Sequence, residues 1–277
     1  MAQSPHTLSL RHEISLYGTF GGSSLPGHYT GNVSPSEVFG KFGSGGGVGY
    51  TFFFHPQWGV TTGAEAAFFN ATVQSAKLTG STLETYSYGA ATEPMYFNSV
   101  LENYEETQRV TYIHVPLLLQ FQTAGRHKFF MAVGGKVGFA LSGNYEATAA
   151  NLTTSGYLPE SAQTFTNMPN HGFTTIQKPA STGAIDFGLN VSAAAEMGVR
   201  WAMGKRVALY TGVYLDYGLL DVAPEKTAGL VNYQAATPRE FIYNSILTAQ
   251  QSPTGEVYVD KVNLFSAGIK VRLAVGW

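Results

Sequence analysis

Long stretches of strict period-two alternation constrain this chain more than any other feature of its sequence. Over residues 6–20, apolar side chains such as Ile14 and Phe20 alternate with polar ones such as Ser15. Period two is the side-chain repeat of a β-strand, because successive residues point to opposite faces. The stretch is longer than the five or six residues of a usual strand, and longer than the 9–11 or so that cross a bilayer at a tilt. The alternation therefore predicts a strand long enough to cross a membrane.

The same alternation recurs along the whole chain, and helical periodicity is absent. No window approaches the roughly 18 uninterrupted apolar residues of a membrane-spanning helix. We therefore predict an all-β fold in one domain over residues 1–277. The predicted strands, an even number, are 6–20, 42–54, 58–74, 108–122, 128–142, 184–202, 206–221 and 257–277.

The connections between these strands fall into two classes that alternate. Residues 55–57, 123–127 and 203–205 form tight connections, whereas the other connections are far longer than compact domains usually need. Strict alternation places all long connections at one end of a barrel. Short periplasmic turns and long extracellular loops are typical of outer-membrane barrels. The pattern predicts an eight-stranded antiparallel up-and-down transmembrane β-barrel with four long extracellular loops and both termini in the periplasm.

A soluble, lipocalin-like barrel is the alternative fold, and it would turn the apolar faces inward. Composition decides against it. Charged residues make up 12% of the chain, whereas soluble domains carry about 25%. Aromatic residues also lie near the strand ends, as at Phe54, Phe129 and Trp201, where interfacial girdles are expected. We therefore expect the apolar stripes to face lipid.

Composition also excludes several functions. The net charge of −2 disfavours nucleic-acid binding by a cationic face. The chain contains no cysteine, so disulfides, thiolate metal sites and cysteine nucleophiles are excluded. We expect neither a cofactor nor a metal. The first residues lack the charged and apolar regions of a secretory signal, so we expect a form processed after export.

Three motifs resemble those of a known family. Tyr112–Leu119 is similar to the "Y-hydrophobic-E-I-P-L-L-L" strand of PorT-like barrels, with His114 in place of the usual acid. Gly134–Phe139 and Asp186–Leu189 resemble the family's glycine-rich strands. The chain thus resembles small outer-membrane barrels of the OmpA and OmpX type, and most closely the PorT-like barrels of Bacteroidota. The resemblance implies a bacterial outer-membrane location and an accessory role in type IX secretion or gliding.

The C-terminal residues resemble the signal that the barrel-assembly machinery recognises, although Trp277 stands where Phe is commoner. The residues concerned are Ile269, Val271, Leu273, Val275 and Trp277.

The polar faces of the predicted strands carry a set of ionisable residues at similar depths. A barrel of eight strands leaves a bore that side chains just fill, and buried charges must be paired. We expect an ionic plug in which Glu13 pairs with Lys270 and Lys136 with Glu196. A proton or small-solute path through Glu65, His114 and Lys136 is the alternative. The predicted network comprises Arg11, Glu13, Glu65, His114, Lys136, Glu196, Arg200, Asp216, Lys270 and Arg272.

The long connection over residues 75–107 is rich in acidic and aromatic residues. Tyrosine is enriched at protein interfaces, so this segment is either a partner-binding loop or a solvated, self-packed one. The candidate contact residues are Glu84, Tyr86, Tyr88, Tyr96, Phe97 and Tyr104.

These features favour a non-catalytic outer-membrane protein with a plugged lumen, acting as a surface scaffold or a subunit of a larger complex. The expected partners are outer-membrane lipids, lipopolysaccharide, the barrel-assembly machinery and other outer-membrane proteins. A narrow or gated pore is one alternative. An enzyme acting on lipid or peptide, with His171 beside Ser155, Ser161 or Asp186, is the other.

Overall fold

A computed structural model describes residues 11–30, 33, 38–88, 91–226, 228–234, 237 and 240–277. Among these residues, no helix has the length and apolar character needed to cross a membrane. The elements are β1 (His12–Ser24), β2 (Gly27–Tyr29), β3 (Val38–His55), β4 (Trp58–Tyr88), β5 (Ala91–Gln122), β6 (Lys128–Thr148), β7 (Asn151–Leu158), β8 (Gln163–Phe165), the 3₁₀ turn η2 (Pro169–His171), β9 (Thr175–Gln177), β10 (Ala180–Ala184), β11 (Asn190–Ala202), β12 (Val207–Gly218), β13 (Ala228–Gly229), β14 (Val231–Asn232), β15 (Ile242–Tyr243), β16 (Ala249–Gln250), β17 (Val259–Val262) and β18 (Phe265–Gly276).

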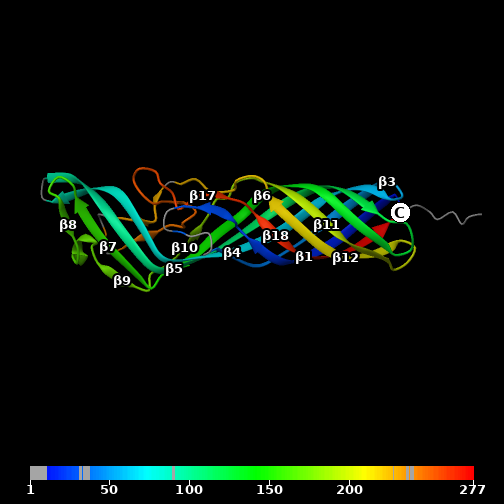
Figure 1. Ribbon diagram of the computed structural model, residues 1–277, viewed down its shortest axis with the longest axis horizontal. Helices are drawn as coiled ribbons and strands as arrows, with labels where there is room; N and C mark the ends of the chain where they lie inside the picture. Colours follow the sequence, from blue (N-terminus) through cyan, green and yellow to red (C-terminus); the bar gives the residue numbers. More distant parts are fainter. Residues whose placement is uncertain are drawn as a thin grey trace, which may run out of the picture.

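The long strands pair antiparallel in the order β6–β11–β12–β18–β1–β3–β4–β5. A further antiparallel pairing joins β5 to β6, so the series of neighbours returns to the strand where it began. The predicted all-β antiparallel architecture is confirmed. Figure 1 shows an elongated molecule, with the long strands slanting along one half and β7, β8 and β9 at the far end from the C terminus.

Apolar side chains face outward over one half of the molecule. Leu16 is 65% exposed, Leu117 is 64% exposed and Ile269 is 59% exposed. Inward-facing neighbours on the same strands, such as Ser15 and His114, are buried. The prediction that the apolar stripes face outward is therefore confirmed. We call this outward apolar surface the belt, and the part of the molecule that it surrounds the barrel segment.

Several strand boundaries differ from the prediction, most of all around residues 75–107. This segment is no loop, because β4 continues to Tyr88 and β5 begins at Ala91, paired in register over most of their length. Asn103 lies in this stretch with φ 51°, where the inward-facing alternation of β5 changes phase. The buried face of β4 changes phase at the same level, and the two strands keep one pairing register on both sides of this point.

Other strands begin later than predicted. β1 starts at His12, and residues 6–10 lie outside the described part of the chain. β11 starts at Asn190, and the start of the last predicted strand is a separate short strand, β17. The predicted long loops carry short strands of their own, β2, β7–β10 and β13–β17, whereas the three tight connections are found as predicted.

Beyond the belt, the hairpin of β4 and β5 continues as the spine of a second region, which we call the extension. It comprises the described residues within 71–107, 143–185 and 221–262. Its inward side is apolar: Leu78, Phe97, Leu152 and Ile246 all belong to one buried hydrophobic cluster. Its outward side carries exposed polar residues such as Glu102. The extension is therefore built like a water-soluble protein.

Candidate functional site

The centre of the barrel segment holds a lysine between two carboxylates. Nζ of Lys136, on β6, donates to both oxygens of Glu65, on β4, at 3.0 and 3.1 Å. It also donates to Oδ2 of Asp216, on β12, at 2.8 Å. All three side chains are buried. Neither β4 nor β12 pairs with β6, so this cluster connects strands that are not neighbours in the sheet.

A second ion pair lies in the same bore. Nζ of Lys270, on β18, donates to Oε1 of Glu196, on β11, and it lies 3.9 Å from the centre of the Tyr17 ring. Gly47 makes room for that ring, since a Cβ there would lie 2.8 Å from the Tyr17 hydroxyl oxygen. The glycine-rich β3 thus provides space for the polar filling.

A third cluster lies nearer the tight turns. Glu13 accepts hydrogen bonds from Arg200, at 2.7 Å, and from the Tyr210 hydroxyl, at 2.6 Å. The Arg272 guanidinium lies 3.8 Å from the centre of the Tyr210 ring and donates to Gln120 at 2.9 Å. Each buried charge here has a polar or aromatic partner, as burial of a charge requires.

His114 fills space on the opposite side of the Lys136 cluster from the tight turns. Its Nε2 lies 3.1 Å from Nδ2 of Asn190, and its ring stacks on Tyr112 at 5.5 Å. Gly138 lies under the ring, so close that a Cβ would collide with it. Among the described residues, no group of three or more potential ligands is placed to hold a metal ion.

The ionised groups of the bore balance one another. The acidic members are Glu13, Glu65, Glu196 and Asp216, and the basic members are Lys136, Arg200, Lys270 and Arg272. Their formal charges cancel. A buried charge is tolerated when it is paired and hydrogen-bonded, and removing one partner is strongly destabilising. This arrangement fills and cross-links the bore.

Two parts of the expected network need correction. Arg11 is exposed, because it precedes β1 at the end of the barrel segment and extends into solvent. Glu13 pairs with Arg200 instead of Lys270, and Lys136 pairs with Glu65 and Asp216 instead of Glu196. The expected pairs were based on neighbouring strands, but long side chains in a narrow bore reach strands further around it.

The predicted contact residues of 75–107 do not share one surface. Phe97 and Tyr104 are buried in the core of the extension, which corrects their expected exposure. They lie on the inward face of β5, which packs on the connection after β12. Tyr86 forms a hydrogen bond of 2.9 Å with Nδ1 of His171, the histidine of the enzyme alternative. Tyr96 contacts Tyr157 at 6.4 Å between ring centres.

Glu84 and Tyr88 are the two remaining candidate contact residues. Glu84 is partly exposed on β4. Tyr88 is the last residue of β4, and its side chain lies outside the described part of the structure.

A buried carboxylate in the extension escaped the sequence analysis. Glu106 accepts hydrogen bonds from Tyr104 at 2.6 Å, Gln108 at 2.7 Å, the Ser245 hydroxyl at 2.7 Å and the backbone N–H of Ile246 at 3.1 Å. It thereby ties β5 to the connection between β15 and β16. Burial raises the pKa of Glu106 above its ordinary value, and the four donors partly offset this.

The signal that could have identified this group was present in the sequence. Tyr104, Glu106 and Gln108 share the phase of Tyr112 and His114, so they extend the inward face of the predicted strand 108–122.

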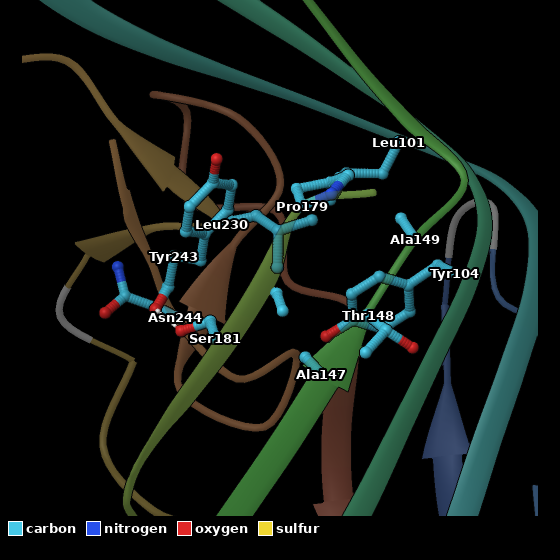
Figure 2. A pocket seen from close by; sticks show the side chains of 11 residues that line it. Leu101, Tyr104, Ala147, Thr148, Ala149, Pro179, Ser181, Leu230, Tyr243 and Asn244 are labelled. Carbon is cyan, nitrogen blue, oxygen red and sulfur yellow. Dashed lines mark hydrogen bonds between the residues drawn. The ribbon is translucent and has the colours of Figure 1, made fainter. Parts of the chain in front are cut away.

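A pocket in the extension is lined in part by Tyr104, whose hydroxyl donates to this carboxylate (Figure 2). Its lining includes Leu101, Tyr104, Pro179, Leu230 and Tyr243. It has room for about one water molecule. It is therefore a packing defect of the core and too small to hold a substrate.

The C-terminal stripe lies on the belt. Ile269, Val271, Leu273, Val275 and Trp277 are all exposed on the outside, between 40% and 59%. Their proposed role in assembly requires this outward placement.

The outward apolar belt and the paired charges in the bore are the reverse of the arrangement in a soluble barrel. The family described as the outer membrane protein beta-barrel domain matches residues 1–223. The chain belongs to this family. This outer-membrane β-barrel is accordingly a protein of the bacterial outer membrane, of Gram-negative type.

The solved structures that the chain matches include other outer-membrane proteins. Outer membrane protein OprG from Pseudomonas aeruginosa is 11% identical, with a TM-score of 0.35 and 97% of each chain covered. Ail, the attachment invasion locus protein of Yersinia pestis, is 10% identical, with a TM-score of 0.30, and 96% of this chain and 99% of that one are covered.

Neisserial surface protein A is 9% identical to this outer-membrane β-barrel, with a TM-score of 0.32, and 94% of this chain and 95% of that one are covered. No curated protein sequence matches the chain. The assignment of the chain to its family rests on the family match and on none of these structures.

Proposed function

We propose that this outer-membrane β-barrel is a closed, non-catalytic surface protein. Its transmembrane barrel consists of eight long strands, its bore is plugged by side chains, and its extension presents a rigid surface outside the cell. Both termini and the tight turns then lie on the periplasmic side. The strands concerned are β1, β3, β4, β5, β6, β11, β12 and β18.

The observation that carries this proposal is the bridge from Lys136 to Glu65 and Asp216. It connects β6 to β4 and β12, which do not neighbour it, and so it spans the interior instead of lining a wall. Eight strands leave a bore that side chains just fill, whereas porins need 16 or more strands for an aqueous channel. An ion that entered would have to separate these buried pairs.

The extension supports the proposed orientation and role. Long connections emerge from the extracellular end of outer-membrane barrels, and the extension occupies that end. Its apolar core and hydrogen-bonded strands hold its outward face in a fixed shape, as a recognition surface requires. Its partners would be other outer-membrane proteins or extracellular ligands. An accessory role in type IX secretion would follow from the resemblance to PorT-like barrels.

Lipid contacts complete the proposal. The belt would contact outer-membrane lipids, with lipopolysaccharide at its outer edge, and the C-terminal stripe would be recognised by the barrel-assembly machinery.

Conductance in planar bilayers tests the plug directly. The folded protein is expected to show no sustained single-channel openings, under conditions in which a porin conducts. The variant Glu65→Ala/Lys136→Ala/Asp216→Ala removes the central cluster and leaves the bore with one excess positive charge, and it should admit small ions more readily. Sustained openings of the wild-type protein would contradict the proposal and support a narrow pore.

A further inference from the structure

The end of the barrel segment that carries the tight turns has basic residues and, among the described residues, no exposed side-chain carboxylate. Glu13, the acidic residue nearest this end, is buried and bonded to Arg200. We call the five basic residues at this end the basic rim. They are Arg11, Arg126, Lys128, Lys205 and Arg206.

The basic rim is continuous over several strands. Lys128 is the register partner of Arg200, which places the β5–β6 turn beside the end of β11. The Gly276 N–H donates to the Arg206 carbonyl at 2.8 Å, so the β11–β12 turn lies beside the end of β18. The Arg11 N–H donates to the Trp277 carbonyl at 3.2 Å. The rim therefore extends from the β5–β6 turn to the start of β1.

Interfacial aromatic residues lie directly beside this rim. Trp201 is 40% exposed, and its ring lies 5.4 Å from that of His127 in the β5–β6 turn. Trp277 is exposed and stacks on His12 at 5.7 Å. Tryptophan marks the level of the lipid headgroups in membrane proteins, and long basic side chains extend from there to the phosphates. The rim thus lies at headgroup depth.

The opposite end of the molecule has the reverse charge. The extension's acidic residues outnumber its basic ones, so the net charge of −2 conceals a strong separation along the long axis. The exposed acidic residues of the extension include Glu102, Glu105, Glu146, Glu160, Glu256 and Asp260. The exposed side chains at the tight-turn end thus carry an excess of positive charge, and those of the extension an excess of negative charge.

We propose that the basic rim binds the phosphate headgroups of anionic phospholipids in the leaflet that it faces. Assignment of that leaflet as the periplasmic one rests on the orientation proposed above. A row of lysines and arginines at headgroup depth attracts anionic lipid, and the attraction decreases with salt because it is electrostatic. Such lipids would hold the barrel at a fixed depth and rotation in the membrane.

Lipid selectivity in symmetric bilayers tests this inference. The folded protein is placed in phosphatidylcholine vesicles that contain trace spin-labelled phosphatidylglycerol or phosphatidylcholine, and the motionally restricted fraction of each label is measured. Wild-type protein should retain phosphatidylglycerol several-fold better than phosphatidylcholine, and high salt should reduce this preference. The variant Arg126→Gln/Lys205→Gln/Arg206→Gln should lose most of it.

A matched control removes the same number of charges from the extension, as Lys77→Gln/Lys178→Gln/Lys261→Gln, and should retain the preference. Equal retention of both lipids by the wild type, or equal loss in the two variants, would overturn the inference. If the triple rim variant does not fold, the inference is tested with the single variants and with the salt dependence of the wild type's preference for phosphatidylglycerol. Symmetric bilayers make the result independent of orientation and of the plug, so its failure leaves the proposed function standing.

Discussion

The barrel segment and the extension share two strands and have opposite polarity. On β5, His114 faces inward and Leu117 outward in the barrel segment, whereas Phe97 faces inward and Asn98 outward in the extension. β4 and β5 keep one pairing register from one region to the other, apart from a break at Ala76 and Asn103. What changes is the solvent outside. A continuous strand can therefore serve both a lipid-facing barrel and a water-facing sheet, if its side chains exchange faces at the boundary.

The two regions consequently depend on different interactions. In lipid, outward apolar side chains gain little by burial, so specific pairing of polar groups inside holds the barrel segment together. In water, burial of apolar surface is the main stabilising contribution, and the core of the extension supplies it. Substitutions in one region should act through one of these mechanisms and leave the other region intact.

The largest expected effect comes from Lys136→Ala. It leaves Glu65 and Asp216 buried without their cation and should lower the free energy of unfolding by about 4 kcal/mol. Urea unfolding in vesicles can be followed by fluorescence of Trp58, Trp201 and Trp277, which all lie in the barrel segment. The matched control Arg109→Ala breaks the exposed pair with Glu146 and should cost less than about 1 kcal/mol. Equal effects would contradict the role of the bore charges.

Phe97→Ala should have the next largest effect, confined to the extension. Phe97 packs on Tyr233 and Phe241, and its removal from the core should cost about 3 kcal/mol. Hydrogen exchange should accelerate over β5 beyond the belt, while the tryptophan-detected unfolding of the barrel segment stays at the wild-type value. If Phe97→Ala destabilised the extension and the barrel segment together, the two regions would unfold as one unit.

Leu117→Arg tests where the polarity reverses. Leu117 lies mid-way along the belt portion of β5, where an arginine facing lipid should cost about 2 to 3 kcal/mol. Asn98→Arg, on the outward side of the same strand in the extension, should be nearly neutral. The comparison is made by unfolding both variants in the same vesicles. A similar cost for both would place Asn98 in lipid.

The smallest effect concerns pH. The pKa of Glu106 is raised in the folded state, so the protonated carboxyl favours folding. This contribution is fully present below the ordinary pKa of about 4.5 and is lost as pH rises through the folded value. The extension should therefore resist proteolysis better in acid than at neutral pH. Glu106→Gln, which cannot ionise, should remove the pH dependence; an unchanged profile would contradict this assignment.

Much of the barrel segment could be predicted from the sequence, because lipid outside imposes a regular alternation that is visible in residues such as Leu16 and Leu117. The extension could not. Its outward side is polar and its inward side mixes Leu78 with Gly80 and Thr82, which resembles a loop in composition. The phase of the buried face then changes at Asn103, so one period cannot be followed through β5.

The pairing of charges was also beyond the sequence. Counting residues along each strand predicts how deep a side chain lies in the bore, and this count predicts similar depths for Glu65, Lys136 and Glu196. Which partner a lysine reaches depends on the geometry of the bore, where Lys136 passes its neighbouring strands and contacts β4 and β12.

Site-directed spin labelling along β5 tests the reversal of polarity most directly, since the chain has no native cysteine to interfere. Single cysteines at Val115, Leu117 and Leu119, and at Tyr96, Asn98 and Glu102, would carry labels on the outward face of one strand. The first group should be accessible to lipid-soluble oxygen, and the second to a water-soluble nickel chelate. If all six positions were accessible to the same reagent, the change of solvent along β5 would be refuted.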